Sequence, residues 1–147
     1  ITDLTGQLFY GDSQVVSKRS TCLRRSVGAV IVKNRQIVAT GYNGTLLNLS
    51  IAGEGCLREQ LKVPSGQMHE LCRGIHAEQN AVVQAAYHGD PLTEVRCIVL
   101  ISGVVCTKIL INAGIERIVY ANPYPDKLAE EMLKAANMKV TILHDED

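Results

Sequence analysis

Residues 96–143 read RCIVLISGVVCTKILINAGIERIVYANPYPDKLAEEMLKAANMKVTIL, and this stretch decides the fold class. Short β-branched and apolar runs, which are typical of strands, alternate in it with segments that have the spacing of helices. Because strands that alternate with helices pair in parallel through right-handed crossovers, the stretch predicts a parallel α/β arrangement. The predicted order is strand Arg96–Ile101, helix Val105–Ala113, strand Glu116–Ala121, helix Pro125–Ala136 and strand Met138–Leu143.

Toward the N-terminus, two further apolar runs, Val27–Val32 and Gln36–Tyr42, flank a short turn and predict a hairpin. His76–His88 is rich in Ala, Gln and Val and predicts a helix, whereas residues 3–20 carry a weak helical pattern interrupted by glycines. Residues 43–75 show no clear period, and a loop of this length in a small domain is usually functional.

The chain is expected to form one domain over residues 1–147, because its 147 residues are the size of an ordinary domain and contain no linker or repeat. Adding the hairpin to the three parallel strands predicts a three-layer α/β/α fold, in which helices cover both faces of a five-stranded mixed sheet.

Charge and cysteine usage narrow the classes of partner and compartment. Lys and Arg together number 15, as do Asp and Glu, so no net charge favours nucleic acid or an anionic membrane. No apolar run approaches the roughly 20 residues of a membrane span. An odd number of cysteines without a visible targeting signal argues for a reduced, cytoplasmic setting with thiols available for metal. A local basic cluster is suited to one phosphate group: Lys18, Arg19, Arg24 and Arg25.

The residues with the clearest chemistry open two predicted helices. His76 and Glu78 begin one, and Cys106 lies thirty residues later, near the start of the next. Imidazole and thiolate suit Zn²⁺, which lowers the pKa of a bound water, and a carboxylate that is not a ligand can then carry protons. The alternative is purely structural: a capping imidazole, a solvated first-turn glutamate and a small buried thiol.

The sequence resembles the deoxycytidylate (dCMP) deaminases, including the late-competence deaminases of bacteria, which have a cytidine deaminase-like fold. The resemblance covers nearly the whole chain. It rests on an ordered set of motifs: Ser20–Arg25 (STCLRR), Val27–Val32 (VGAVIV), Gly41–Gly44 (GYNG), Gly55–Glu59 (GCLRE), Pro64–Gln67 (PSGQ), His69–Asn80 (HELCRGIHAEQN) and Ile111–Tyr120 (INAGIERIVY).

The resemblance implies hydrolysis of dCMP to dUMP and ammonia, with His76 and Cys106 as zinc ligands and Glu78 as the proton shuttle. It also implies that Asn43 contacts the nucleotide, that Ala77 contacts the base through its backbone, and that Tyr120 lies near the substrate. It further implies a homo-oligomer, often a hexamer, with dCTP and dTTP as effectors. Asn43 has an alternative role as a turn former.

Two segments depart from the family's pattern. The family carries S-P-C-x-x-C before the helix that follows the first parallel strand, but here Ser102 replaces the proline and Gly103 replaces the first cysteine. The third ligand expected for the catalytic zinc is therefore absent. Between residues 44 and 52, a His-Cys pair that often joins a second zinc has become Ile51-Ala52. Four residues remain as ligands for a second site, or else as ordinary buried side chains: Cys22, Cys56, His69 and Cys72.

These departures leave two functions open. The first is a zinc-dependent dCMP deaminase that is impaired at its metal site. The second is a catalytically inactive homologue that binds nucleotides or serves as an assembly subunit. Nucleic-acid editing is a third class, and the neutral chain argues against it because it lacks the basic groove that such binding needs.

Overall fold

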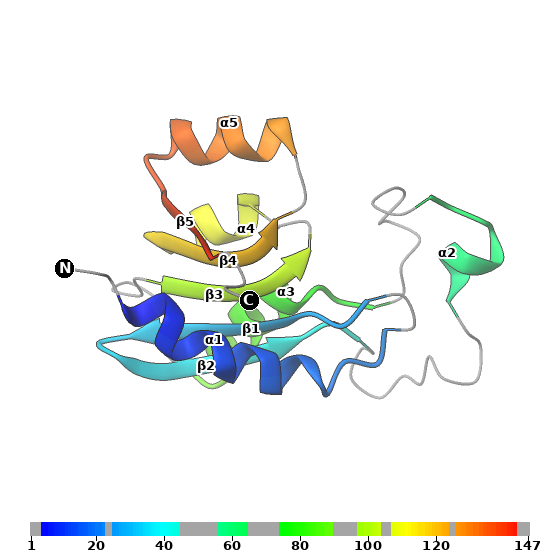
Figure 1. Cartoon of the computed structure of the whole chain (residues 1–147), viewed down its shortest axis with the longest axis horizontal. Helices are drawn as coiled ribbons and strands as arrows, with labels where there is room; N and C mark the ends of the chain where they lie inside the picture. Colours follow the sequence, from blue (N-terminus) through cyan, green and yellow to red (C-terminus); the bar gives the residue numbers. More distant parts are fainter. Residues whose placement is uncertain are drawn as a thin grey trace.

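The predicted hairpin forms β1 (Gly28–Lys33) and β2 (Gln36–Tyr42), which pair antiparallel. Asn34 and Arg35 connect them with φ angles of 51° and 62°, as in the type I′ turn whose twist suits a two-residue hairpin. The computed structural model that shows this (Figure 1) describes residues 4–22, 25–44, 56–64, 74–89, 97–103, 107–123 and 126–143.

The C-terminal part alternates as its sequence predicts. β3 (Cys97–Gly103), β4 (Arg117–Pro123) and β5 (Lys139–Leu143) pair in parallel with one another. β1 pairs antiparallel with β3, so that the strand order is β2-β1-β3-β4-β5. The N-terminal hairpin therefore extends the sheet on the side opposite to β4 and β5.

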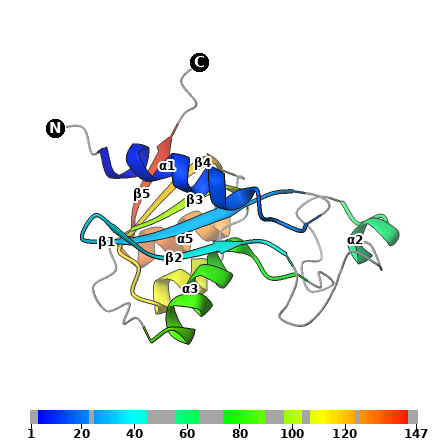
Figure 2. The same ribbon diagram turned by 90° about the horizontal axis from the view of Figure 1, so that it is seen from below.

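Helices cover both faces of this sheet (Figure 2). α1 (Leu4–Ser17) lies on one face, which confirms a helix where the sequence pattern is weak. On the other face lie α3 (Ala77–Tyr87), α4 (Thr107–Asn112) and α5 (Lys127–Ala135). Residues 43–75 show no clear period in sequence, but the part of them that the structure describes includes a short helix, α2 (Leu57–Gln60).

The side chains of the central strands explain this layering. In β1, Ala29 and Ile31 belong to the apolar core beneath α3, α4 and α5, whereas Val30 and Val32 belong to the core beneath α1. A strand that is buried on both faces has to carry a continuous apolar run. The run VGAVIV therefore predicts the central position that β1 occupies.

Gly41 permits the close contact between β2 and α3. A β carbon at this position would overlap the carbonyl oxygen of Ala77 and the amide nitrogen of Ala81, and would lie 2.9 Å from the Ala81 α carbon. Ala77 and Ala81 are themselves fully buried. The start of α3 therefore packs directly against the backbone of β2 at Gly41.

Among the residues that the structure describes, no helix combines the length and the apolar character that crossing a bilayer would require.

Candidate active site at the start of α3

The end of β2 and the start of α3 are joined by backbone hydrogen bonds. The Gly44 N–H donates to the Ile75 carbonyl at 3.2 Å, and the Ile75 N–H donates to the Gly44 carbonyl at 2.9 Å. From within α3, Asn80 Nδ2 donates to the Tyr42 carbonyl at 3.1 Å. The GYNG motif and the HAEQN motif, which are far apart in the sequence, therefore meet at one edge of the fold.

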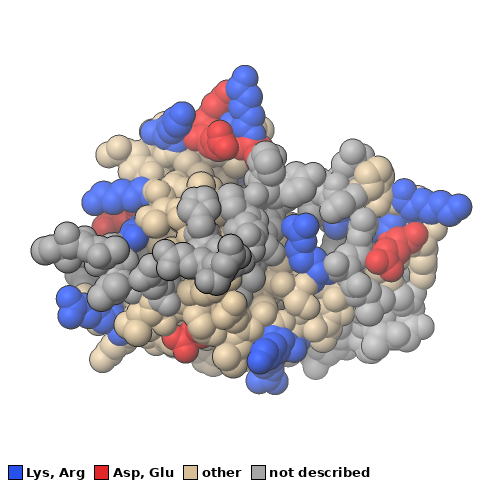
Figure 3. Space-filling view, in the orientation of Figure 1, with Lys and Arg blue, Asp and Glu red and all other residues tan. Residues whose placement is uncertain are grey.

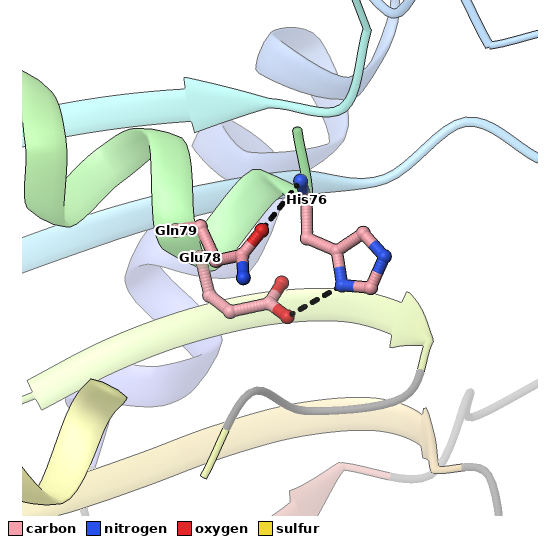
Figure 4. Close-up of polar contacts among 3 residues, drawn as sticks. All are labelled: His76, Glu78 and Gln79. Carbon is pink, nitrogen blue, oxygen red and sulfur yellow. Dashed lines mark hydrogen bonds and ion pairs between the residues drawn. The ribbon is translucent and has the colours of Figure 1, made fainter. Parts of the chain in front are cut away.

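His76 is the N-cap residue of α3, with extended backbone angles. Its N–H donates to Gln79 Oε1 at 3.1 Å, so the side chain at the third helical position satisfies the backbone of the cap. This bond orients the turn that carries His76 and Glu78 (Figure 4). Sequence reasoning missed Gln79, although a glutamine three residues after a helix start is a recognisable capping signal.

His76 and Glu78 face each other across this first turn (Figure 4). His76 Nδ1 lies 3.6 Å from Glu78 Oε1, and only 4% of the Glu78 side chain is exposed, against 25% for His76. Glu78 is therefore not the solvated glutamate of the purely structural alternative. A buried carboxylate needs a cation or hydrogen-bond donors, and the positive end of the α3 dipole favours its charge.

Asn43 anchors the segment that precedes β1. Its Oδ1 accepts hydrogen bonds from the Val27 N–H at 2.8 Å and from Ser20 Oγ at 2.5 Å. Its Nδ2 donates to the Arg25 carbonyl at 2.7 Å. With these contacts to described residues, the Asn43 amide oxygen accepts the two hydrogen bonds that it can accept. Its amide nitrogen donates one of its two hydrogens, so the other can bond to a ligand. A turn-forming asparagine bonds to backbone groups within a few residues of itself. The side-chain partners of Asn43 lie 16 to 23 residues away, so its role here is a long-range one.

Removal of this anchor is expected to destabilise the fold. Asn43→Ala deletes three hydrogen bonds and should lower the free energy of unfolding by about 2 kcal/mol, measured by urea denaturation. Asn43→Asp keeps the oxygen that accepts from Val27 and Ser20. Its free energy of unfolding should therefore fall by about half as much as that of Asn43→Ala. Equal unfolding midpoints for Asn43→Ala and the parent would rule out the anchoring role.

The structure describes three of the four basic residues that were suggested to bind one phosphate group. Lys18, Arg19 and Arg25 are exposed, and the Arg19 guanidinium lies 5.8 Å from the centre of the Tyr42 ring, whereas Arg24 lies outside the described residues. On the face shown in Figure 3, Lys and Arg side chains are spread over several elements and are mixed with acidic ones over α5.

Tyr120 lies in β4, opposite Leu100 of β3 and Ile142 of β5. It is half-buried against the core beneath α5. Burial raises the pKa of the Tyr120 hydroxyl, and the nearby charge of Glu130 raises this pKa further. Tyr120 is three residues before the end of β4, so its backbone lies about 10 Å from that edge of the sheet.

Gly103 is the last residue of β3 and is paired with Pro123 of β4. α4 begins four residues later at Thr107, and Cys106 lies outside the described residues. The family's first cysteine would therefore stand at the end of β3, the middle strand of the five-stranded sheet. Glycine supplies no ligand there.

The donors that the structure does describe are of the right kinds for zinc. An imidazole nitrogen and a carboxylate oxygen, both common zinc ligands, lie within 3.6 Å of each other. Within the described ranges, no cluster of three or more His, Cys, Asp or Glu side chains is placed to hold a metal. Of the four residues suggested for a second site, Cys22 and Cys56 are half-buried free thiols, and His69 and Cys72 lie outside the described part.

Comparison with known proteins places this site in context. Residues 6–122 match the model of the cytidine and deoxycytidylate deaminase zinc-binding region. ComE operon protein 2 of Bacillus subtilis (strain 168) is 36% identical over 144 residues, which cover 91% of this chain and 68% of that protein. The deoxycytidylate deaminase of Schizosaccharomyces pombe is 29% identical over 130 residues, which cover 87% of this chain but only 40% of the yeast protein.

Solved structures support the expected fold. The dCMP deaminase from the cyanophage S-TIM5 in its apo form superposes with a TM-score of 0.74 at 24% identity, covering 97% of this chain and all of that one. The same enzyme in complex with dCMP and dUMP gives a TM-score of 0.70. The predicted cytidine deaminase-like α/β architecture is confirmed.

Proposed function

Because the chain belongs to the cytidine and deoxycytidylate deaminase family, we propose that it hydrolyses the 4-amino group of dCMP, giving dUMP and ammonia. Relatives named deoxycytidylate deaminase and a structural neighbour that holds dCMP and dUMP support this choice of substrate. The observation that carries the proposal is the buried carboxylate of Glu78, 3.6 Å from the imidazole of His76 at the start of α3.

Each residue of the site has a role in this reaction. His76 and Cys106 would hold zinc, which, when bound, makes a water molecule acidic enough to react near neutral pH. Glu78 takes one proton from the attacking water and delivers it to N3 of the base. It then takes the second proton from the hydroxyl group now on C4 and passes it to the amino group, which leaves as ammonia while C4 becomes a carbonyl. The backbone of Ala77 and the remaining amide hydrogen of Asn43 would orient the base and the sugar, and Tyr120 would line the substrate's surroundings.

The wider setting is also proposed from the family. We place the protein in the cytoplasm as a homo-oligomer, with a hexamer as the expected form and with dCTP and dTTP as effectors. Neither nucleic acid nor a membrane is proposed as a partner, because the sequence carries no net charge.

A second function has a specific observation in its favour. Gly103 stands where the family carries a zinc-binding cysteine, and a chain without that ligand is suited to be an inactive homologue that binds nucleotide or assembles with other subunits.

Activity and metal content distinguish the two functions. The chain, purified with zinc, is expected to release ammonia from dCMP slowly, to lose this activity on chelation, and to regain it with zinc. Glu78→Gln keeps the shape of the side chain but cannot shuttle protons, and should lower turnover by about 10²–10⁴-fold. If dCMP binds without any zinc-dependent ammonia release, the inactive homologue is the better description.

A further inference from the structure

Asn80 joins the two parts of the candidate site, because it forms hydrogen bonds with the backbone of both. We propose that Asn80 is a positioning residue, which sets where the Asn43 amide lies relative to the turn that carries His76 and Glu78. The inference rests on the proposed function in taking Asn43 as a contact to the nucleotide. It adds a residue that acts on the substrate through another side chain.

The backbone and the side chain of Asn80 bond to different elements. The Asn80 N–H donates to the carbonyl of His76 at 2.9 Å, which is the bond that the N-cap carbonyl accepts at the start of a helix. Asn80 Nδ2 donates to the Tyr42 carbonyl at 3.1 Å. One residue therefore holds both the backbone of the N-cap and the peptide group that leads into Asn43.

The Tyr42 carbonyl lies at an open edge of the sheet. β2 is an outermost strand and has β1 on one side. The Asn43 N–H donates to the Val27 carbonyl at 3.3 Å, on the β1 side. Because successive residues of an antiparallel strand point their backbone groups to opposite sides, the Tyr42 carbonyl points away from β1. Carbonyls at such an edge lack a strand partner, and here Asn80 supplies the donor.

The peptide group between Tyr42 and Asn43 is thus held at both ends. Its N–H is bonded on the β1 side, and its carbonyl is bonded on the α3 side. Since a peptide group is planar, these two bonds together fix the direction in which the chain enters Asn43. The amide hydrogen of Asn43 that remains for a ligand is oriented by the same two bonds.

The side-chain bonds of Asn43 do not provide this link to α3. They join it to the segment that precedes β1, at Ser20, Arg25 and Val27. The Asn80 bond instead ties Asn43 to the helix that carries the acid–base group. The close packing at Gly41 keeps α3 on β2, so loss of the Asn80 bond should cause a small shift and not a separation. A small shift is enough to weaken a ligand contact, because hydrogen bonds weaken steeply when they are misaligned.

Hydrogen exchange tests the link without any nucleotide. Asn80→Leu removes the donor at nearly the same side-chain size, and leucine favours a helix more than asparagine does. Exchange of the Asn43 amide hydrogen, followed by NMR, is expected to become about fivefold faster or more, as for the loss of one supporting hydrogen bond. The Ile75 amide, which bonds to Gly44, should exchange at the parent rate. Asn112→Leu makes the same change at an exposed residue of α4 and should alter neither rate.

A double-mutant cycle tests whether Asn80 acts on the nucleotide through Asn43. The affinity for dCMP is measured by isothermal titration calorimetry for the parent, Asn80→Leu, Asn43→Asp and the variant with both changes. Asn43→Asp keeps the anchoring oxygen and removes the amide hydrogen that is left for a ligand. Asn80→Leu should weaken dCMP binding about fivefold in the parent background. In the Asn43→Asp background the same change should weaken it by less than about twofold, because the contact that it misaligns is already gone.

Equal effects of Asn80→Leu on dCMP affinity in the two backgrounds overturn the inference, and so does an Asn43 amide that exchanges at the parent rate. Asn80→Asp has the shape of asparagine but no donor when ionised, and it should reproduce both effects. Circular dichroism of each variant shows that the fold is kept. Binding of dCMP that responds to Asn43→Asp and not to Asn80→Leu refutes the inference and leaves the proposed function standing. A parent that binds no dCMP contradicts the proposed function, and the exchange rates then decide by themselves whether Asn80 holds Asn43.

Discussion

Gly103→Cys is expected to raise dCMP turnover by about 100-fold or more, because the new thiolate restores the third protein ligand that a catalytic zinc usually has. Gly103 lies at the end of β3 in strand conformation, which a residue with a β carbon adopts without strain. Ammonia release under saturating dCMP and zinc measures the effect. Zinc content should approach one ion per chain in the same samples.

Gly103→Ser is the matched control for this change. Its side chain is close in size to that of cysteine but offers no thiolate, so turnover should stay within about tenfold of the parent. If Gly103→Cys binds zinc stoichiometrically and is no faster than the parent, the missing cysteine is not what limits activity.

Among Gly→Ala substitutions at the described glycines near the site, Gly41→Ala should lower the free energy of unfolding most. The new methyl group would meet the backbone of Ala77 and Ala81, which cannot rotate away as a flexible side chain would. We expect the free energy of unfolding to fall by about 3 kcal/mol, measured by urea denaturation. Activity should fall as well, because α3 carries His76 and Glu78 and would be displaced from β2.

Gly11→Ala serves as the control for the same chemical change. Gly11 is an exposed residue of α1, and a β carbon there would have nothing within 4 Å. Alanine is preferred to glycine inside a helix by about 1 kcal/mol, so this variant should be slightly more stable than the parent. Similar unfolding midpoints for the two variants would contradict the close packing of β2 against α3.

The C-terminal strands and helices could be predicted from sequence because each is marked by its own local pattern. The same is true of β1, whose continuous apolar run reflects burial on two faces. α2 was missed because four residues are too few to show a helical period. α1 was predicted only weakly, because Gly6 and Gly11 lower helix propensity and packing on the sheet compensates for it.

The site was less predictable than the fold. His76 and Glu78 lie close because they are two residues apart at a helix start, and motif spacing alone indicates this. The depth at which Glu78 is buried depends on how α3 packs on β2, which no local pattern records. For the same reason, the bonds that occupy the Asn43 amide could not be foreseen, since they join it to backbone groups of a distant segment.

The pair of hydrogen bonds between Gly44 and Ile75 has a consequence for the substitutions that the fold tolerates. The chain leaves the scaffold at Gly44 and rejoins it at Ile75, and the two bonds close this excursion at its base. Replacement of residues within such an excursion costs the scaffold little, because loop length and content are tolerated when the ends are fixed. We therefore expect substitutions within residues 45–52 to leave α3 in its position on β2.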